Sequence, residues 1–357
     1  MDQLDVEQPA IVGVRREREQ AVGDRGGVGS AATAFGCAFG CGGTARLICC
    51  TGGSEGDPLT AAATNVPEVT LAAVVVNSAI YGGSGGPFAV LSTNSSSIDI
   101  GRHELGHTIA HLADEYSAPY PGYPLCDAAT DCPEPNATLH AVRPGKWGPW
   151  VTASQPIPTP SGTTGIGYFE GCRYMTTGVY RPADTCIMNA LGFPFCSVCA
   201  EAMSLAFWSH VHPIDTTTPA TTSPIATTGC ATQDFSVTLP ANAGALATSW
   251  TVDGAAQSAT TPTITLDANN FVAGTHTVVA TIHDGSPLIR TDPQSLTSES
   301  ATWMWSTTCA GMPHPDGGSG GGTAGGGCCN AADHTATSGL AALAVALVLG
   351  RRRRAGR

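Results

Sequence analysis

The sequence predicts an α+β domain followed by an all-β sandwich. Two apolar runs, residues 69–77 and 88–92, have the pattern of strands, and the first is apolar enough to be buried on both faces. A helix is expected to follow, because Ser96 and Asp99 fit a capping box ahead of a periodic apolar pattern. Between residues 229 and 310, short segments alternate apolar and polar residues, with Asp-Gly pairs between some of them, which is typical of a β-sandwich.

Further elements complete the predicted order of the chain. A short strand is expected at 45–50, a Pro-rich loop at 117–165 and a second helix at 200–210. The resulting domains are a disordered or mis-called N-terminus at 1–30, an α+β domain at 31–213, a Thr/Pro linker at 214–228, a sandwich at 229–310, a Gly-rich linker with a Cys pair at 311–330, and a short apolar helix with an Arg-rich tail at 331–357.

Composition and charge limit the possible partners. Only 12% of the 357 residues are charged, and 16 Lys and Arg face 28 Asp and Glu, which gives a net charge of −12. This balance excludes nucleic acid as a partner, because little positive charge is present to neutralise phosphates. The 14 cysteines favour an oxidising, extracellular compartment.

The cysteine spacings predict several disulfides. Cys126 and Cys132 are close enough in sequence to close a short loop, and Cys230 and Cys309 bracket the sandwich segment. The CxxC pair Cys196 and Cys199 fits a zinc site, a redox pair or a structural disulfide. We favour the disulfide, because no second CxxC lies at zinc-ribbon spacing.

The two ends of the chain give different indications about secretion. Residues 1–25 carry charges and no apolar segment, so we expect a mis-called or truncated start in place of the signal peptide. Near the other end, Cys328-Cys329 is followed by the apolar run 339–350 and by four arginines, an order that obeys the positive-inside rule for a transmembrane-type helix. This segment resembles a myxobacterial C-terminal sorting tail, which implies a cell-surface, outer-membrane-associated location with membrane contact only through the tail.

The most informative motif is HELGH at residues 103–107. Positions i and i+4 of a helix lie on one face, so His103 and His107 can direct both imidazoles to one zinc ion. Glu104 lies beside them and is expected to act as general base on the zinc-bound water. The pattern therefore predicts a zinc hydrolase.

A catalytic zinc requires a third protein ligand. Asp114 would lie about 16 Å from His103 along an unbroken helix. The helix is therefore expected to end near residues 110–112, and the chain to turn back. His111 and Glu115 are the rival candidates for the third ligand.

Together these motifs resemble the IgA peptidase family of bacterial zinc metallopeptidases, which are metzincins. The resemblance covers residues 35–205 and includes NSxxYGGSGG at 77–86, the segment HELGHxxxxLADEY, GVYRP at 178–182, CIM at 186–188 and FCxVCxEA at 195–202. It implies a metzincin fold, a twisted mixed sheet with the active-site helix. Met188 would form a Met-turn under the zinc, and Asp114 would be the third ligand.

The same resemblance implies an oxyanion role for a Tyr near the Met-turn, which makes Tyr180 a catalytic candidate and Tyr116 an alternative. The sequence departs from the family at the turn after the helix, where Ala110 and His111 stand in place of Gly.

The sequence therefore predicts a secreted or surface-sorted zinc metalloendopeptidase that hydrolyses extracellular proteins or peptides. Its expected site comprises Glu104 and Tyr180 as catalytic residues and His103, His107 and Asp114 as zinc ligands. We expect a monomer with an immunoglobulin-like sandwich at 229–310. The alternatives are an inactive metzincin-like surface binding protein and a zinc amidase that acts on cell-wall peptides.

Overall fold

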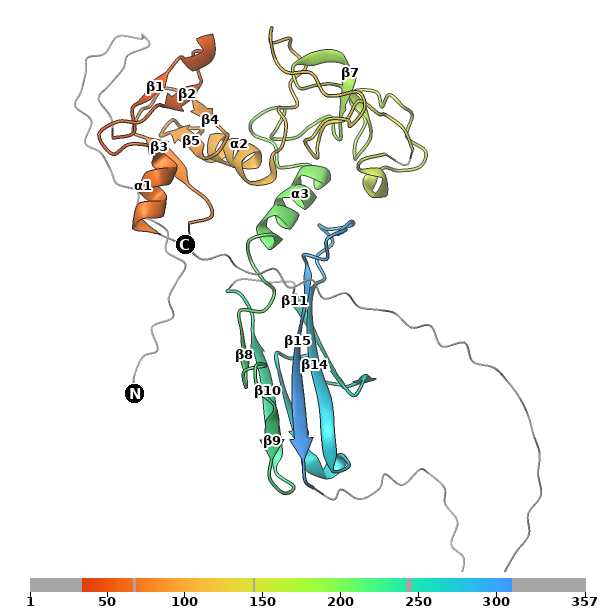
Figure 1. The fold of residues 1–357 in the computed structure, drawn as a ribbon. Helices are drawn as coiled ribbons and strands as arrows, with labels where there is room; N and C mark the ends of the chain where they lie inside the picture. Colours follow the sequence, from red (N-terminus) through yellow and green to blue (C-terminus); the bar gives the residue numbers. More distant parts are fainter. Residues whose placement is uncertain (1–33, 67–68, 144, 242–245, 310–357) are drawn as a thin grey trace, which may run out of the picture. The chain divides into compact units, whose positions relative to one another are not determined.

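The computed structural model describes residues 34–66, 69–143, 145–241 and 246–309 (Figure 1). The expectations for the N-terminal segment 1–30, the Gly-rich linker and the sorting tail fall outside these residues. Within them, no helix is both long and apolar enough to cross a membrane.

The described chain begins with a disulfide-bonded hairpin. Strands β1 (Cys37–Phe39) and β2 (Ile48–Cys50) pair antiparallel, and the short 3-10 helix Cys41–Gly43 lies between them. Two disulfides close the hairpin, Cys37–Cys50 and Cys41–Cys49. Helix α1 (Pro58–Asn65) follows, and the Asp57 side chain caps its first turn by accepting from two backbone N–H groups.

A three-stranded sheet supports the central helix. Its strands are β3 (Ala73–Val76), β4 (Gly83–Ser84) and β5 (Ala89–Ser92), in the order β3-β5-β4, with β3 parallel and β4 antiparallel to β5. The prediction that residues 69–77 form a strand buried on both faces is wrong. Strand β3 lies at the sheet edge, and the Val75 side chain on it is 40% exposed.

Helix α2 (Ser97–Ala110) carries the HELGH motif. Its N-cap is Ser96, as expected, but the predicted capping box is absent, because the Ser96 side chain makes no cap hydrogen bond. The Asn94 side chain accepts from the Ser96 N–H instead. Asp99 pairs with Arg102 one turn further along the helix.

The end of α2 is a sharp reversal. His111 takes the left-handed conformation, with φ 52° and ψ 38°, and its backbone N–H bonds to the Gly106 carbonyl. Leu112 donates to the same carbonyl at 3.1 Å. The chain therefore turns back at the position where the sequence requires it, although a non-glycine residue occupies the left-handed position.

His111→Gly is expected to stabilise the fold. A side chain in the left-handed region costs about 1 kcal/mol, and glycine removes that cost. The His111 side chain is exposed, so the substitution removes little packing. Thermal unfolding of the two proteins measures the effect, and a lower melting temperature for the glycine variant would contradict this account of the turn.

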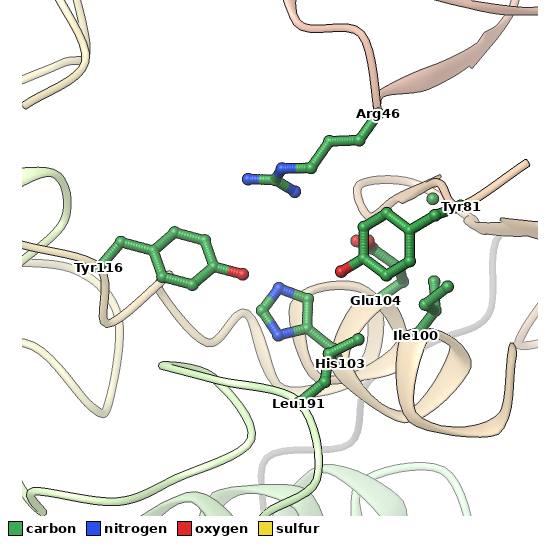
Figure 2. Close-up of a pocket in the computed structure, with 8 residues that line it drawn as sticks. Arg46, Tyr81, Ile100, His103, Glu104, Tyr116 and Leu191 are labelled. Carbon is green, nitrogen blue, oxygen red and sulfur yellow. The ribbon is translucent and has the colours of Figure 1, made fainter. Parts of the chain in front are cut away.

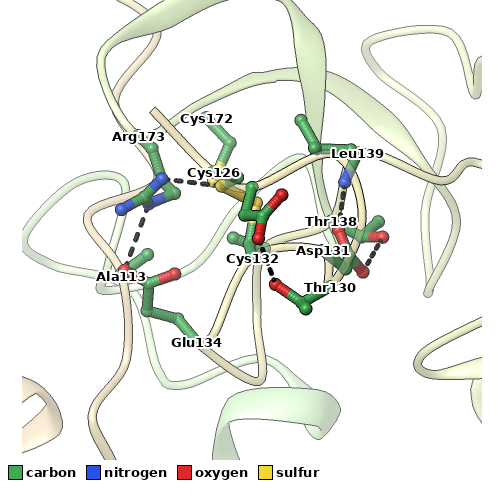
Figure 3. Close-up of a disulfide and its surroundings, with 12 residues drawn as sticks. Ala113, Cys126, Thr130, Asp131, Cys132, Glu134, Thr138, Leu139, Cys172 and Arg173 are labelled. Carbon is green, nitrogen blue, oxygen red and sulfur yellow. Dashed lines mark hydrogen bonds and ion pairs between the residues drawn. A yellow bond between two sulfur atoms is a disulfide. The ribbon is translucent and has the colours of Figure 1, made fainter. Parts of the chain in front are cut away.

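Long loops and a second hairpin follow α2. Strands β6 (Phe169–Cys172) and β7 (Met175–Arg181) pair antiparallel, and helix α3 (Ser197–Trp208) comes after them. The short 3-10 helix Gly148–Trp150 lies within the loops. The predicted disulfide Cys126–Cys132 is confirmed, and the Arg173 guanidinium contacts its Cys126 sulfur while pairing with Glu134 (Figure 3).

The predicted disulfide of the CxxC pair is wrong. Cys196 and Cys199 are both free thiols in the described structure, and so are Cys172 and Cys186. All four are buried. Near them, one core cluster joins α3 to the end of α2; its fully buried members include Tyr168, Ile187 and Met188.

The C-terminal strands form two sheets around one hydrophobic cluster. A three-stranded sheet has the order β13-β10-β8, and a five-stranded sheet has the order β12-β11-β14-β15-β9. The strands are β8 (Thr216–Thr218), β9 (Ile225–Thr227), β10 (Thr232–Thr238), β11 (Leu246–Val252), β12 (Ala255–Ala256), β13 (Thr263–Asp267), β14 (Gly274–Asp284) and β15 (Ser298–Thr307), with the 3-10 helix Ala268–Asn270 after β13.

Both sheets contribute to the shared core. Phe235 comes from the smaller sheet and Trp250, Trp303 and Trp305 from the larger, and none of the four is more than 1% exposed. The predicted disulfide Cys230–Cys309 is confirmed. The expected linker 214–228 is partly strand, because β8 pairs with β10 and β9 pairs with β15.

Candidate metal centre and active site

Three ligand atoms converge beside α2. The Nε2 atoms of His103 and His107 are 3.1 Å apart, and Asp114 Oδ1 lies 3.1 Å from the first and 3.4 Å from the second. The two histidines share one face of the helix, and the reversal at His111 brings Asp114 back to them. The structure therefore places together the three residues that the sequence predicts as ligands.

The orientation of both imidazoles is set by backbone carbonyls. His103 Nδ1 lies 2.9 Å from the Ile187 carbonyl oxygen, and His107 Nδ1 lies 2.6 Å from that of Leu112. A carbonyl only accepts, so each Nδ1 carries the proton and donates. Each neutral ring then presents the lone pair of its Nε2 to the centre, which is the arrangement that metal-ligating histidines adopt.

This donor set fits a cation. Two imidazole lone pairs and a carboxylate oxygen repel one another at these distances unless a positive charge lies between them. Ligand atoms 2.0–2.1 Å from a tetrahedral zinc would be about 3.3 Å apart, which agrees with the observed separations. In the metal-free protein a proton can take that place: burial lowers the pKa of His107, but Asp114 raises it, to about 9 in total.

Asp114 is fixed in place by its neighbours. The Tyr174 hydroxyl donates to Asp114 Oδ2 at 2.5 Å, and the Arg173 N–H donates to the Asp114 carbonyl at 3.0 Å. Burial alone would raise the pKa of the Asp114 carboxyl, but the two histidines lower it below its usual range. Burial and the Asp114 charge raise the pKa of Tyr174, so its hydroxyl keeps the proton that it donates.

Tyr174→Phe is expected to weaken metal binding by 10- to 100-fold, because it removes the hydrogen bond that orients Asp114. Equilibrium dialysis of chelator-treated protein against zinc measures this affinity. Tyr123→Phe is the matched control, since Tyr123 packs against the Tyr174 ring, 4.7 Å between centroids, while the hydrogen bond to Asp114 comes from Tyr174. Equal zinc requirements for the two variants would show that Tyr174 does not support the ligand.

Glu104, the residue that the sequence predicts as general base, lies next to His103 on α2. Its side chain is buried on the face of α2 that meets β4, and a Cβ built on Gly83 would lie 2.9 Å from its Oε1. Burial raises its pKa, while the positive charge of either histidine opposes that rise. The absence of a side chain at Gly83 is therefore what lets β4 pack directly against this carboxyl group.

Gly85 has the same role beside the second ligand. A Cβ at this position would lie 2.5 Å from His107 Cβ and 3.0 Å from the Glu104 carbonyl oxygen. Real Cβ atoms do not come this close to other heavy atoms. Gly83 and Gly85 thus pack closely against the residues of the site, whereas the sequence alone suggests only a loop with little steric restraint.

A small cavity opens above His103 (Figure 2). The side chains of Arg46, Tyr81 and Tyr116 converge on it from three separate segments. Tyr116 stacks on the His103 ring with 6.0 Å between centroids, and the Arg46 guanidinium lies 5.6 Å from the Tyr116 centroid. These groups bring a positive charge and two hydroxyl groups to the edge of the metal centre.

Sequence reasoning missed Arg46 and Tyr174. Arg46 lies in the disulfide-bonded hairpin, 57 residues before His103, and no local pattern distinguishes it from a surface arginine. Tyr174 has φ 59°, an uncommon conformation that is visible only in the structure. Both reach the site through contacts between residues far apart in sequence: the Arg46 guanidinium lies against the Tyr116 ring, and Tyr174 donates to Asp114.

The remaining candidates lie elsewhere. Tyr180 is on β7, where its backbone pairs with Thr138 and its side chain packs against the core cluster, and it is not among the residues that line the described cavity. The exposed His111 forms the turn. Glu115 is fully buried and contacts Asn136 and Cys199 rather than the histidines.

Met188 packs against α2 at Gly106. A Cβ built on this glycine would be 2.9 Å from the Met188 sulfur. The Met188 carbonyl accepts from the Glu115 N–H at 2.9 Å. This contact ties the methionine segment to the residue that follows Asp114.

Comparison with known proteins identifies the class. A family model described as IgA Peptidase M64 matches residues 10–165 and 161–207, which together exceed half of the chain. The chain is therefore a peptidase, a class of hydrolase. It belongs to the IgA peptidase M64 family, as the sequence motifs indicate, and four disulfides are consistent with an extracellular location.

The other comparisons add little. No curated protein matches. Among solved structures, a quinonprotein alcohol dehydrogenase-like protein from Bacteroides thetaiotaomicron matches with 15% identity and a TM-score of 0.19. That match covers 24% of this chain and only 18% of the other, so it supports no argument about fold or function.

Proposed function

We propose that this protein is a secreted zinc endopeptidase in which His103, His107 and Asp114 hold the metal and Glu104 is the general base. One observation carries the proposal: two Nε2 lone pairs and a carboxylate oxygen converge within 3.4 Å, while both Nδ1 atoms donate to carbonyls. Zinc at this point would act as a Lewis acid and lower the pKa of a water molecule to about 7.

The chain supplies the proton transfers and the charge stabilisation. Glu104 accepts a proton from the attacking water and delivers it to the leaving amine, and its raised pKa suits both steps near neutral pH. Tyr116 and Arg46 line the cavity opposite the helix, where they can donate hydrogen bonds to the negatively charged oxygen that develops on the scissile carbonyl. We favour Tyr116 over Tyr180 for this role, because Tyr116 faces the cavity.

We also propose a fold class for each of the two domains. The return of the chain to its third ligand and the position of Met188 under α2 support a metzincin arrangement for residues 31–213. Two sheets with a common core and a disulfide between their ends support an immunoglobulin-like sandwich at 229–310. Surface sorting through the Cys, apolar and Arg tail remains a prediction from the sequence.

Hydrolysis assays on the full chain test the proposed activity. We expect casein to be cleaved at internal bonds, cleavage to stop with a chelator, and zinc to restore it. Cleavage of peptidoglycan fragments without cleavage of casein would instead support a zinc amidase. A protein that binds zinc but hydrolyses neither substrate would be the inactive binding protein.

A further inference from the structure

A second cluster of side chains that could bind a metal lies in the interior, separate from His103, His107 and Asp114. It comprises one carboxylate and three thiols, those of Glu115, Cys186, Cys196 and Cys199. The four ligand atoms all lie within 4.8 Å of one another. Glu115 and Cys186 are fully buried, and Cys196 and Cys199 are at most 9% exposed.

The cluster is chemically incomplete without a cation. Glu115 Oε2 is buried and has no hydrogen-bond partner, although burial of an unpaired carboxylate oxygen is costly. None of the three thiols is in a disulfide. In contrast, eight other cysteines of the described chain form four disulfides.

The separations match tetrahedral coordination. Cys186 and Cys199 have their sulfurs 3.7 Å apart, and the Cys199 sulfur is 3.4 Å from Glu115 Oε1. Around a zinc with Zn–S near 2.3 Å and Zn–O near 2.0 Å, two sulfurs would be about 3.8 Å apart and a sulfur and an oxygen about 3.5 Å. These two separations therefore agree with a closed, four-ligand site, and the remaining ligand atoms lie within 4.8 Å of one another.

Two of the sulfurs lie at the start of helix α3. Cys196 is its N-cap and Cys199 lies in its first turn, where the helix dipole favours negative charge, while contact with the other sulfurs and burial act against it and raise the pKa of both thiols. The Cys196 backbone N–H points to the Cys186 sulfur at 3.4 Å. Asn136 donates to Glu115 Oε1 at 3.0 Å, as outer-shell partners do for ligating carboxylates.

We propose that Glu115, Cys186, Cys196 and Cys199 bind a second, structural zinc ion. Soft thiolates in a tetrahedral set select zinc, and four protein ligands leave no open position for substrate. Binding displaces the thiol protons to solvent. The site corrects the sequence interpretation of the CxxC, because its partners are Cys186 and Glu115 rather than a second CxxC.

This ion would hold in place the segments that support the proposed catalytic centre. Glu115 directly follows Asp114 in the sequence. Cys186 directly precedes Ile187, and the Ile187 carbonyl orients His103. The site would thus connect the third-ligand segment, the Met188 segment and the start of α3. The inference stands on its own geometry and does not depend on zinc at the catalytic centre.

Metal analysis of the full chain tests the proposal. We expect two zinc ions per chain, and one in the variant with both His103→Ala and His107→Ala. Cobalt substituted into that variant should give sulfur-to-metal charge-transfer absorption, because only the thiolate site remains. The variant Cys199→Ser should lose one zinc and this absorption. Cys172→Ser is the matched control, since Cys172 is a buried free thiol outside the cluster, and it should retain both ions.

Two results would overturn the inference. One is a histidine double variant without zinc or a thiolate–cobalt spectrum. The other is a disulfide between any two of the three cysteines, detected by alkylation and peptide mapping of the untreated protein. Both measurements use variants that keep the thiols, so they remain decisive if Cys199→Ser fails to fold. A parent chain that holds only one zinc, and keeps it when both histidines are replaced, would contradict the proposed catalytic centre and leave the second site intact.

Discussion

Glu104→Gln is expected to retain zinc and the fold but to lower turnover by a factor of 100 to 10,000. Glutamine has the same shape as glutamate, but it cannot accept the proton of the attacking water. The expected loss corresponds to about 3 to 5 kcal/mol of transition-state stabilisation. Peptide hydrolysis and zinc content, measured on the same preparation, separate lost chemistry from lost metal.

Glu170→Gln serves as the control for the charge change. Glu170 lies on β6, where its carboxylate accepts from the Gly178 N–H, and it is not among the residues that line the described cavity. This variant should keep parental turnover. If Glu104→Gln kept near-parental turnover with full zinc, the general-base mechanism would have to be abandoned.

Asp114→Ala is expected to release the catalytic zinc. Outer-shell partners already contribute 10- to 100-fold to metal affinity, so loss of a direct ligand should cost more than roughly 100-fold. The substitution also leaves Tyr174 without its hydrogen-bond acceptor. Elemental analysis should show one zinc fewer per chain than in the parent, together with loss of peptidase activity.

His111→Asn is the matched control for the choice of third ligand. Asparagine tolerates the left-handed conformation, so the turn is kept while the imidazole is removed. This variant should retain the zinc that Asp114→Ala loses. The opposite outcome, zinc lost with His111→Asn and kept with Asp114→Ala, would reassign the third ligand.

Local periodicity was enough to predict the helical part of the site. His103 and His107 are one helical turn apart, and this spacing alone places them on one face with Glu104 next to them. The need for a third ligand then required the helix to end near residue 110, and α2 does end at Ala110. Short-range cysteine spacing likewise predicted Cys126–Cys132.

Predictions from local sequence were wrong where contacts with residues far along the chain determine the structure. The apolar run at residues 69–77 does not become a fully buried strand, because β3 lies at a sheet edge. The segment 214–228 has the composition of a linker, yet strands β8 and β9 form in it because partner strands are available. In both cases a neighbour distant in sequence determines the outcome.

By itself, then, the sequence indicated the family, and it predicted the two histidine ligands, the general base and a reversal of the chain near residues 110–112. The tertiary structure shows Asp114, rather than Glu115 or His111, beside the two histidines, because the direction of each side chain after the turn depends on contacts with Tyr174, Asn136 and Met188. It also brought Arg46 to the cavity and gathered the buried Cys and Glu cluster. Those contacts join residues many positions apart, and such pairs leave no periodic signal in a single sequence.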